Sequence, residues 1–150
     1  MKIISRLTFS LIIFLNINIV LAENNKKVSV TNLWIKEAPP TVSVLVAYAK
    51  LKNNTDTSLS LTSIESPFFS SIEIHRSIIK NDTASMERHT TLEIPSKATV
   101  ELAPGDFHLM LFNPKKPLKI DDAPTLIFGF SDGTQITVRA PIKKRNNTSH

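Results

Sequence analysis

Residues 103–112 read Ala-Pro-Gly-Asp-Phe-His-Leu-Met-Leu-Phe, a turn signal followed by an alternating stretch that contains a histidine and a methionine. From Phe107 onward the pattern predicts a β-strand on which His108 and Met110 share one side, whereas Leu109 points to the other. The preceding Pro-Gly-Asp predicts a turn that delivers this strand to the surface. An imidazole and a thioether are donors that Cu(I) favours and that Mg²⁺ and Ca²⁺ do not. The pair therefore indicates part of a soft-metal site.

Many short β-strands are predicted on both sides of this stretch. The predicted strands are residues 27–35, 42–51, 58–64, 71–79, 86–94, 98–102, 107–112, 126–130 and 135–142. Turn signals separate them, including 53–56 and the tight hairpin at 131–134. No helical periodicity of crossover length and no internal repeat is present, which disfavours a parallel α/β architecture. We therefore predict an all-β protein, an antiparallel sandwich or small barrel.

Residues 1–22 have the features of a cleaved signal peptide. Lys2 and Arg6 form a positive start, residues 7–20 are apolar, and the Val-Leu-Ala that follows fits a small-residue cleavage site before Glu23. The alternative is an uncleaved membrane anchor, but the apolar run is short for a span of about 20 residues. We therefore expect an exported, periplasmic protein that has no membrane span after cleavage.

The rest of the chain is predicted to be one domain at 23–142 followed by a short basic tail at 143–150. The formal net charge is +5, but two of the cations lie in the predicted signal peptide and others in the tail. Because short charged ends are usually solvated, we expect no nucleic-acid partner. The chain has no cysteine. This excludes a Cys nucleophile, a thiol redox pair, a thiolate zinc site and a His₂Cys blue-copper centre.

Two histidines and two methionines of the predicted domain form a spaced set. Ten residues separate His75 from Met86, 21 separate Met86 from His108, and one separates His108 from Met110. His75 lies on the polar side of its predicted strand. Two imidazoles and two thioethers on neighbouring strands would suit a tetrahedral Cu(I) site. Taken singly, a methionine is usually core filler and a histidine a surface residue, so the prediction depends on the combination.

This spacing resembles the H-x10-M-x21-H-x-M motif of the PCuAC family of periplasmic copper chaperones. The similarity extends over about 28–142. It includes Trp34-Ile35-Lys36 before Ala38-Pro39-Pro40, Ala47-Tyr48 leading to Asn53-Asn54, Glu73-Ile74-His75 and Pro104-Gly105. The resemblance implies a cupredoxin-like β-sandwich, a monomer, that binds one Cu(I) through the four residues. It further implies delivery to an acceptor protein, the CuA site of a cytochrome c oxidase subunit.

Several positions depart from the family pattern or leave alternatives open. Asp106 stands where relatives commonly have a second glycine. The tail offers only His150 and no methionine, which gives little support for a second, Cu(II) site. His89, three residues after Met86, is either a substitute ligand or an ordinary polar strand residue. Glu73 lies on the same side as His75 and either orients its imidazole or is simply solvated.

Two other function classes compete with a copper carrier. An enzyme is disfavoured because the chain has no nucleophile elbow, phosphate loop or HExxH pattern. A metal-free β-sandwich module for adhesion or interaction is the main alternative. That alternative leaves the paired placement of histidines and methionines unexplained.

Overall fold

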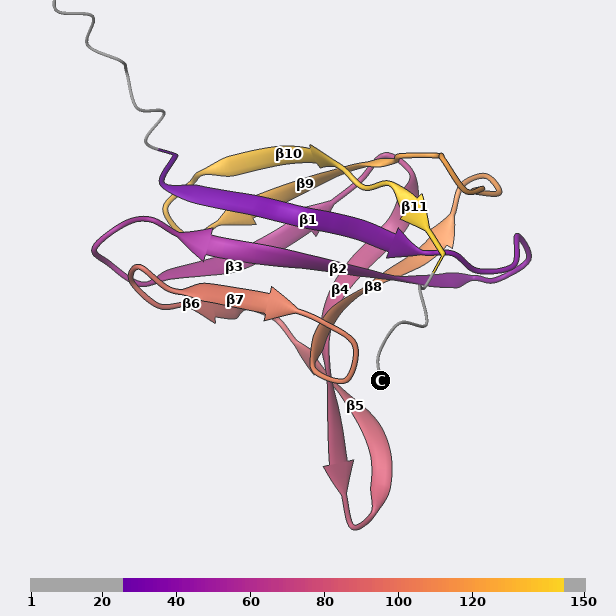
Figure 1. Cartoon of the computed structure of the whole chain (residues 1–150), viewed down its shortest axis with the longest axis horizontal. Coiled ribbons are helices and arrows are strands. Elements are labelled where there is room, and N and C mark those ends of the chain that lie inside the picture. The colour runs from indigo at the N-terminus through magenta and orange to yellow at the C-terminus, as the bar shows by residue number, and fades with distance from the viewer. Residues whose placement is uncertain (1–25, 145–150) are drawn as a thin grey trace, which may run out of the picture.

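The computed structural model describes residues 26–144, and all the regular secondary structure in that range is β-strand (Figure 1). The large sheet has the strand order β11-β1-β2-β8-β4-β5, with β7 also paired to β2, and the small sheet has the order β10-β9-β3-β6. The large sheet consists of β1 (Val28–Lys36), β2 (Val44–Asn53), β4 (Phe69–Lys80), β5 (Thr83–His89), β7 (Thr99–Leu102), β8 (Phe107–Pro114) and β11 (Ile142–Lys143). The small sheet consists of β3 (Leu59–Glu65), β6 (Leu92–Ile94), β9 (Thr125–Phe130) and β10 (Gln135–Arg139).

The two sheets share one hydrophobic core. Its most deeply buried side chains come from both sheets and include Ile35, Leu51, Leu109 and Leu111 from the large sheet and Leu61, Ile94, Leu126 and Phe128 from the small one. Each of these side chains is removed from water, and burial of one such residue contributes about 1.5–3 kcal/mol. The prediction of an all-β sandwich is confirmed.

Strands β7 and β8 pair with successive parts of the same edge of β2. β8 pairs with β2 from Val44 to Ala47, and β7 pairs with it from Ala49 to Lys52. The turn predicted between them is present, and Gly105 takes a φ of +87° there, a conformation that favours glycine. The expectation that this turn delivers the strand to the surface is wrong for His108, which is only 4% exposed. The reason is that β8 lies inside the sheet, between β2 and β4.

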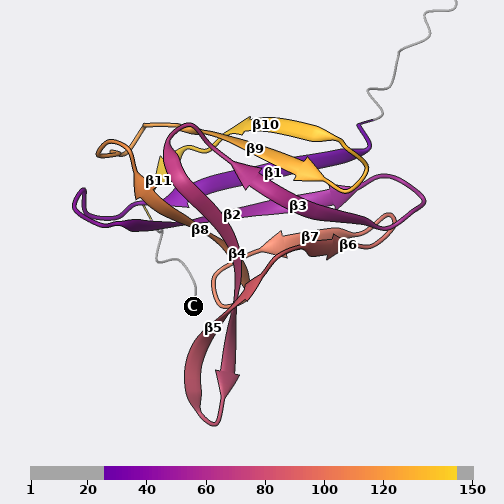
Figure 2. The same ribbon diagram turned by 180° about the vertical axis from the view of Figure 1, so that it is seen from behind.

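The β4–β5 hairpin extends beyond the sandwich. The pairing of the two strands continues from Ile74↔His89 to Lys80↔Thr83. Asn81 and Asp82 join the strands with φ values of 51° and 58°, as a two-residue turn with left-handed central residues requires. Figures 1 and 2 show that the tip of this hairpin points away from both sheets. β4 therefore begins beside β8 and, after Arg76, continues beyond β8 paired only with β5.

Two predicted strands are each divided in the structure. Residues 86–94 were expected to form one strand, but β5 ends at His89 and β6, which begins at Leu92, belongs to the other sheet. Residues 135–142 are likewise divided, and β11 pairs in parallel with β1. The physical reason in the second case is Pro141, which has no N–H to donate to a sheet. Lys143, the first residue of the expected tail, lies in β11.

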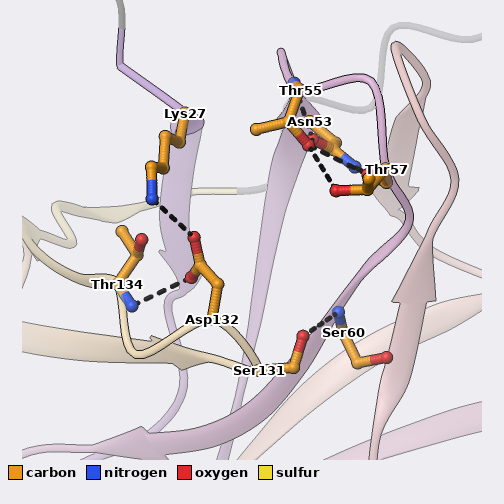
Figure 3. Close-up of polar contacts among 8 residues, drawn as sticks. All are labelled: Lys27, Asn53, Thr55, Thr57, Ser60, Ser131, Asp132 and Thr134. Atoms are coloured by element: carbon orange, nitrogen blue, oxygen red, sulfur yellow. Dashed lines mark hydrogen bonds and ion pairs between the residues drawn. The ribbon is translucent and has the colours of Figure 1, made fainter.

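Buried and exposed polar contacts hold the turns at one end of the sandwich (Figure 3). The amide of Asn53, fully buried at the end of β2, donates to the carbonyls of Thr57 and Ile94 at 2.8 and 3.0 Å, and its oxygen accepts from Thr55. In the predicted 131–134 turn, a hydrogen bond from the backbone N–H of Thr134 lowers the pKa of Asp132. The predicted turns at these positions are confirmed.

Candidate metal site

The predicted ligands lie on one face of the large sheet. Ile74 and Leu109 pair with each other and are buried in the core, so their neighbours along β4 and β8 point away from it. This outward face carries His75 directly opposite His108, and Met110 two residues further along β8. The two imidazole rings are 6.2 Å apart between centroids and inclined by 34°. The structure thus brings three of the four predicted residues together as neighbours.

Met86 lies on the same face but on the next strand. It pairs with Ser77 on β4, so it is a diagonal neighbour of His75, and β4 separates it from β8. Its side chain is 61% exposed. Met110, in contrast, is half-buried inside the sheet. The two methionines therefore lie on either side of the histidine pair, Met86 on the exposed side and Met110 on the more buried side.

The imidazole of His108 is held through one of its two nitrogens. Its Nδ1 lies 2.9 Å from the carbonyl oxygen of Asp106. A carbonyl oxygen only accepts hydrogen bonds, so Nδ1 carries the proton and Nε2 keeps a lone pair. The backbone of the turn before β8 therefore fixes the tautomer of a buried imidazole.

The imidazole of His75 is held through the other nitrogen. Its Nε2 lies 2.9 Å from Glu73 Oε2, and this carboxylate also lies 3.4 Å from the Nε atom of Arg88. A neutral imidazole donates its Nε2–H to the carboxylate. His75 Nδ1 is then a lone-pair acceptor, and it is buried with no hydrogen-bond partner among the described residues. Of the two alternatives for Glu73, contact with the imidazole is the one that the structure contains.

His89 lies on the opposite face of the hairpin. It pairs with Ile74, and its ring makes a T-shaped contact with that of Phe107, at 5.1 Å between centroids. A side chain on the core-directed face cannot join the outward cluster without reversal of the strand. The alternative that His89 is a substitute ligand is therefore disfavoured by the pairing register. His150 lies outside the described residues.

The side chains present fit a soft monovalent metal. Within residues 26–144, no three His, Asp or Glu side chains form a group that could hold a metal ion. The outward cluster offers neutral imidazole and thioether donors, which Cu(I) prefers. The buried Nδ1 of His75 has no hydrogen-bond partner among the described residues, so its lone pair is left for an ion. Nε2 of His89 is also buried without a partner, but it lies on the other face of the sheet, away from both thioethers. Each neutral imidazole also donates its single N–H to a carboxylate or a carbonyl, the usual arrangement of metal-binding histidines.

Sequence reasoning missed two parts of this arrangement. The carbonyl of Asp106 holds His108, and Arg88 contacts the carboxylate that holds His75. Alternation along β5 would place Arg88 on the side of Met86, which is a usable signal. The contact with the Asp106 carbonyl could not be predicted, because every residue has a backbone carbonyl whatever its side chain.

Comparison with known proteins agrees with this fold. The sequence matches the model of the LpqE-like family, described as "Putative lipoprotein LpqE-like", over residues 28–142, and the chain belongs to this family. A protein of Leifsonia xyli subsp. xyli that carries a lipoprotein name is 31% identical over 117 residues, which cover 77% of this chain and 69% of that protein. A protein of Rickettsia prowazekii is 31% identical over 106 residues, which cover 70% of this chain and 59% of that one.

Solved structures with this fold include PCuAC domains. The copper-bound PCuAC domain from PmoF2 superimposes with a TM-score of 0.68 at 19% identity, covering 79% of this chain and 94% of that domain. The solution structure of CuI-DR1885 from Deinococcus radiodurans has a TM-score of 0.61 at 26% identity, covering 79% of this chain and 77% of that protein. The fold is therefore that of PCuAC domains. No helix among residues 26–144 is long and apolar enough to cross a membrane.

Proposed function

We propose that this protein is a copper chaperone of the cell envelope, which binds one Cu(I) through His75, Met86, His108 and Met110. It releases the ion to an acceptor, the CuA site of a cytochrome c oxidase subunit. It acts as a carrier and catalyses no reaction. The lipoprotein names of the family and of a relative support an exported location, in agreement with the predicted signal peptide. The copper named for two proteins of the same fold supports the cargo.

The observation that carries the proposal is that the two imidazoles are hydrogen-bonded through different ring nitrogens, which leaves one lone pair on each ring. Glu73 occupies Nε2 of His75, and the Asp106 carbonyl occupies Nδ1 of His108. Cu(I) would therefore bind His75 through Nδ1 and His108 through Nε2. Neither imidazole needs to lose a proton, and a hydrogen bond already holds each ring, so the site is pre-organised for the ion.

Neutral ligands also suit a carrier. Imidazoles and thioethers add no negative charge, so the loaded site retains the single positive charge of Cu(I). Nothing in this set holds the ion as strongly as thiolate would, which permits release to another soft-ligand site. Met86, as the most exposed of the four residues, is the ligand that an acceptor reaches first.

Competition against a coloured Cu(I) chelator tests the proposal. The wild-type protein should bind one Cu(I) per chain. Met110→Leu preserves side-chain volume and should lower the affinity at least about tenfold, because loss of a ligand costs more than loss of an outer-shell partner. His108→Ala should act in the same direction.

His89→Ala is the matched control, since it removes an imidazole from the same sheet but from the opposite face. Its Cu(I) affinity should equal that of the wild type. Equal affinities in Met110→Leu, His108→Ala and the wild type would reject the site. No Cu(I) binding at all would favour a metal-free interaction module instead.

A further inference from the structure

The exposed large hydrophobic side chains among residues 26–144 are Ile79 and Met86, at 82% and 61% exposure, and both lie on the β4–β5 hairpin. Ile79 pairs with Ala84 and Met86 pairs with Ser77, so the two lie on the outward face, on adjacent strands, as diagonal neighbours. Single exposed hydrophobic residues need no explanation. Here, however, two exposed hydrophobic residues lie side by side on a hairpin that projects from the molecule, and contiguous apolar surface of this kind marks interaction sites (Figures 1 and 2).

The two faces of the projecting hairpin differ in charge. The outward face beyond His75 carries only uncharged side chains, and we call it the hairpin apolar face: Ser77, Ile79, Ala84 and Met86. The opposite face carries the charged residues Arg76, Lys80 and Glu87 around the half-buried Ile78. The apolar face continues directly from the candidate ligands.

Met86, on the hairpin, is the most exposed of the four candidate ligands. It is 61% exposed, whereas His75 and Met110 are half-buried and His108 is 4% exposed. An incoming donor atom of another protein can therefore reach the ion from the Met86 side. A protein surface that approaches Met86 closely enough to exchange a metal ligand also covers Ile79, its diagonal neighbour.

We propose that the hairpin apolar face is the docking surface for the protein that exchanges copper with this chain. This inference rests on the proposed function and names the partner's chemistry: soft ligands surrounded by an apolar rim. In the exchange, a lone pair of the partner's ligand forms a bond to Cu(I) as the bond from the Met86 thioether breaks. The copper stays Cu(I) and no electron is transferred. The apolar face is small, which suits a transient complex rather than a permanent one.

Transfer kinetics of the Cu(I)-loaded protein test the proposal, with an isolated apo CuA domain as the acceptor. Ile79→Asp places a charge on the apolar face without removing a ligand. It should slow the second-order transfer about tenfold, which corresponds to about 1.4 kcal/mol. Thr83→Asp is the matched control. It adds the same charge to the same hairpin, but on the opposite face beside Lys80, so long-range steering changes alike in both variants. At high ionic strength, where that steering is screened, the control should leave the rate within about twofold.

The Cu(I) affinity and the oligomeric state distinguish loss of docking from loss of copper binding and from self-association. The Cu(I) affinity of Ile79→Asp against a small chelator, which needs no docking surface, should equal that of the wild type. Equal transfer rates for Ile79→Asp and wild type, equal slowing by both variants, or no transfer from the wild type would overturn the docking surface. A wild-type dimer that Ile79→Asp dissociates without slower transfer would assign the face to self-association and overturn it too. Failure of the wild type to bind Cu(I) would instead reject the proposed function, and this inference with it.

Discussion

At the scale of single residues, the candidate site depends on which nitrogen of each imidazole is held. The carboxylate of Glu73 and the carbonyl of Asp106 are both pure acceptors, and each lies 2.9 Å from one ring nitrogen. They select opposite tautomers in two histidines that face each other across neighbouring strands. The lone pairs that remain are those that a metal ion needs.

This arrangement predicts different tautomers for the two histidines in the metal-free protein. At about pH 8, where imidazoles are ordinarily neutral, His75 should be protonated at Nε2 and His108 at Nδ1, because these nitrogens have acceptors. Nitrogen-15 chemical shifts from long-range ¹H–¹⁵N correlation spectra report each tautomer directly. Glu73→Ala should alter the shifts of His75 and leave those of His108 unchanged. Observation of the same tautomer for both rings would contradict the contacts.

The sequence carries part of this information. Alternation along a strand predicted that His108 and Met110 share a face and that His75 lies opposite the buried Ile74, and the structure confirms both. The burial of His108 was not predictable, because it depends on the position of β8 between two other strands. The face of His89 depends on the pairing register of the hairpin, which no local pattern specifies.

At the scale of elements, periodicity predicted most strands but not the sheet to which each belongs. Residues 86–94 have the composition of one strand, yet β5 and β6 lie in different sheets. A switch between sheets needs only a short irregular segment, and no distinctive residue marks it. The projection of the hairpin is equally invisible in the sequence, since it follows from the greater length of β4 compared with its contact with β8.

The end of β2 shows how one buried polar residue joins elements. Asn53 hydrogen-bonds to the following turn and to the carbonyl of Ile94 on β6, so it connects the two sheets. Asn53→Ala removes these bonds and leaves buried groups without partners, each of which costs about 1–3 kcal/mol. We expect an overall loss of about 2–4 kcal/mol in the free energy of unfolding, measured by urea denaturation.

Asn54→Ala provides the comparison for this prediction. The side chain of Asn54 donates one exposed hydrogen bond, to the carbonyl of Lys26, so its removal should cost at most about 1 kcal/mol. Similar losses in the two variants would show that burial of Asn53 does not contribute as argued.

At the scale of the whole molecule, the core and the candidate metal site lie on opposite faces of the large sheet. The hydrophobic core that the two sheets share contains none of the four candidate ligands. The metal-free protein should therefore unfold cooperatively on its own core. Bound copper adds stability only through mass action, because it binds the folded chain.

The stability that bound copper adds can be measured separately from the stability of the metal-free core. At a buffered free Cu(I) concentration about a hundred times the dissociation constant, the free energy of unfolding should rise by about 2.7 kcal/mol. Thermal or urea unfolding in a chelator-buffered Cu(I) solution measures the increment.

Met86→Leu should leave the stability of the metal-free protein within about 0.5 kcal/mol, because the residue is 61% exposed. The same variant should reduce the copper-dependent increment at that concentration, because a leucine of similar volume offers copper no donor. If Met86→Leu kept the full increment, Met86 would not be a ligand, and the exposed side of the site would have to be assigned to another residue.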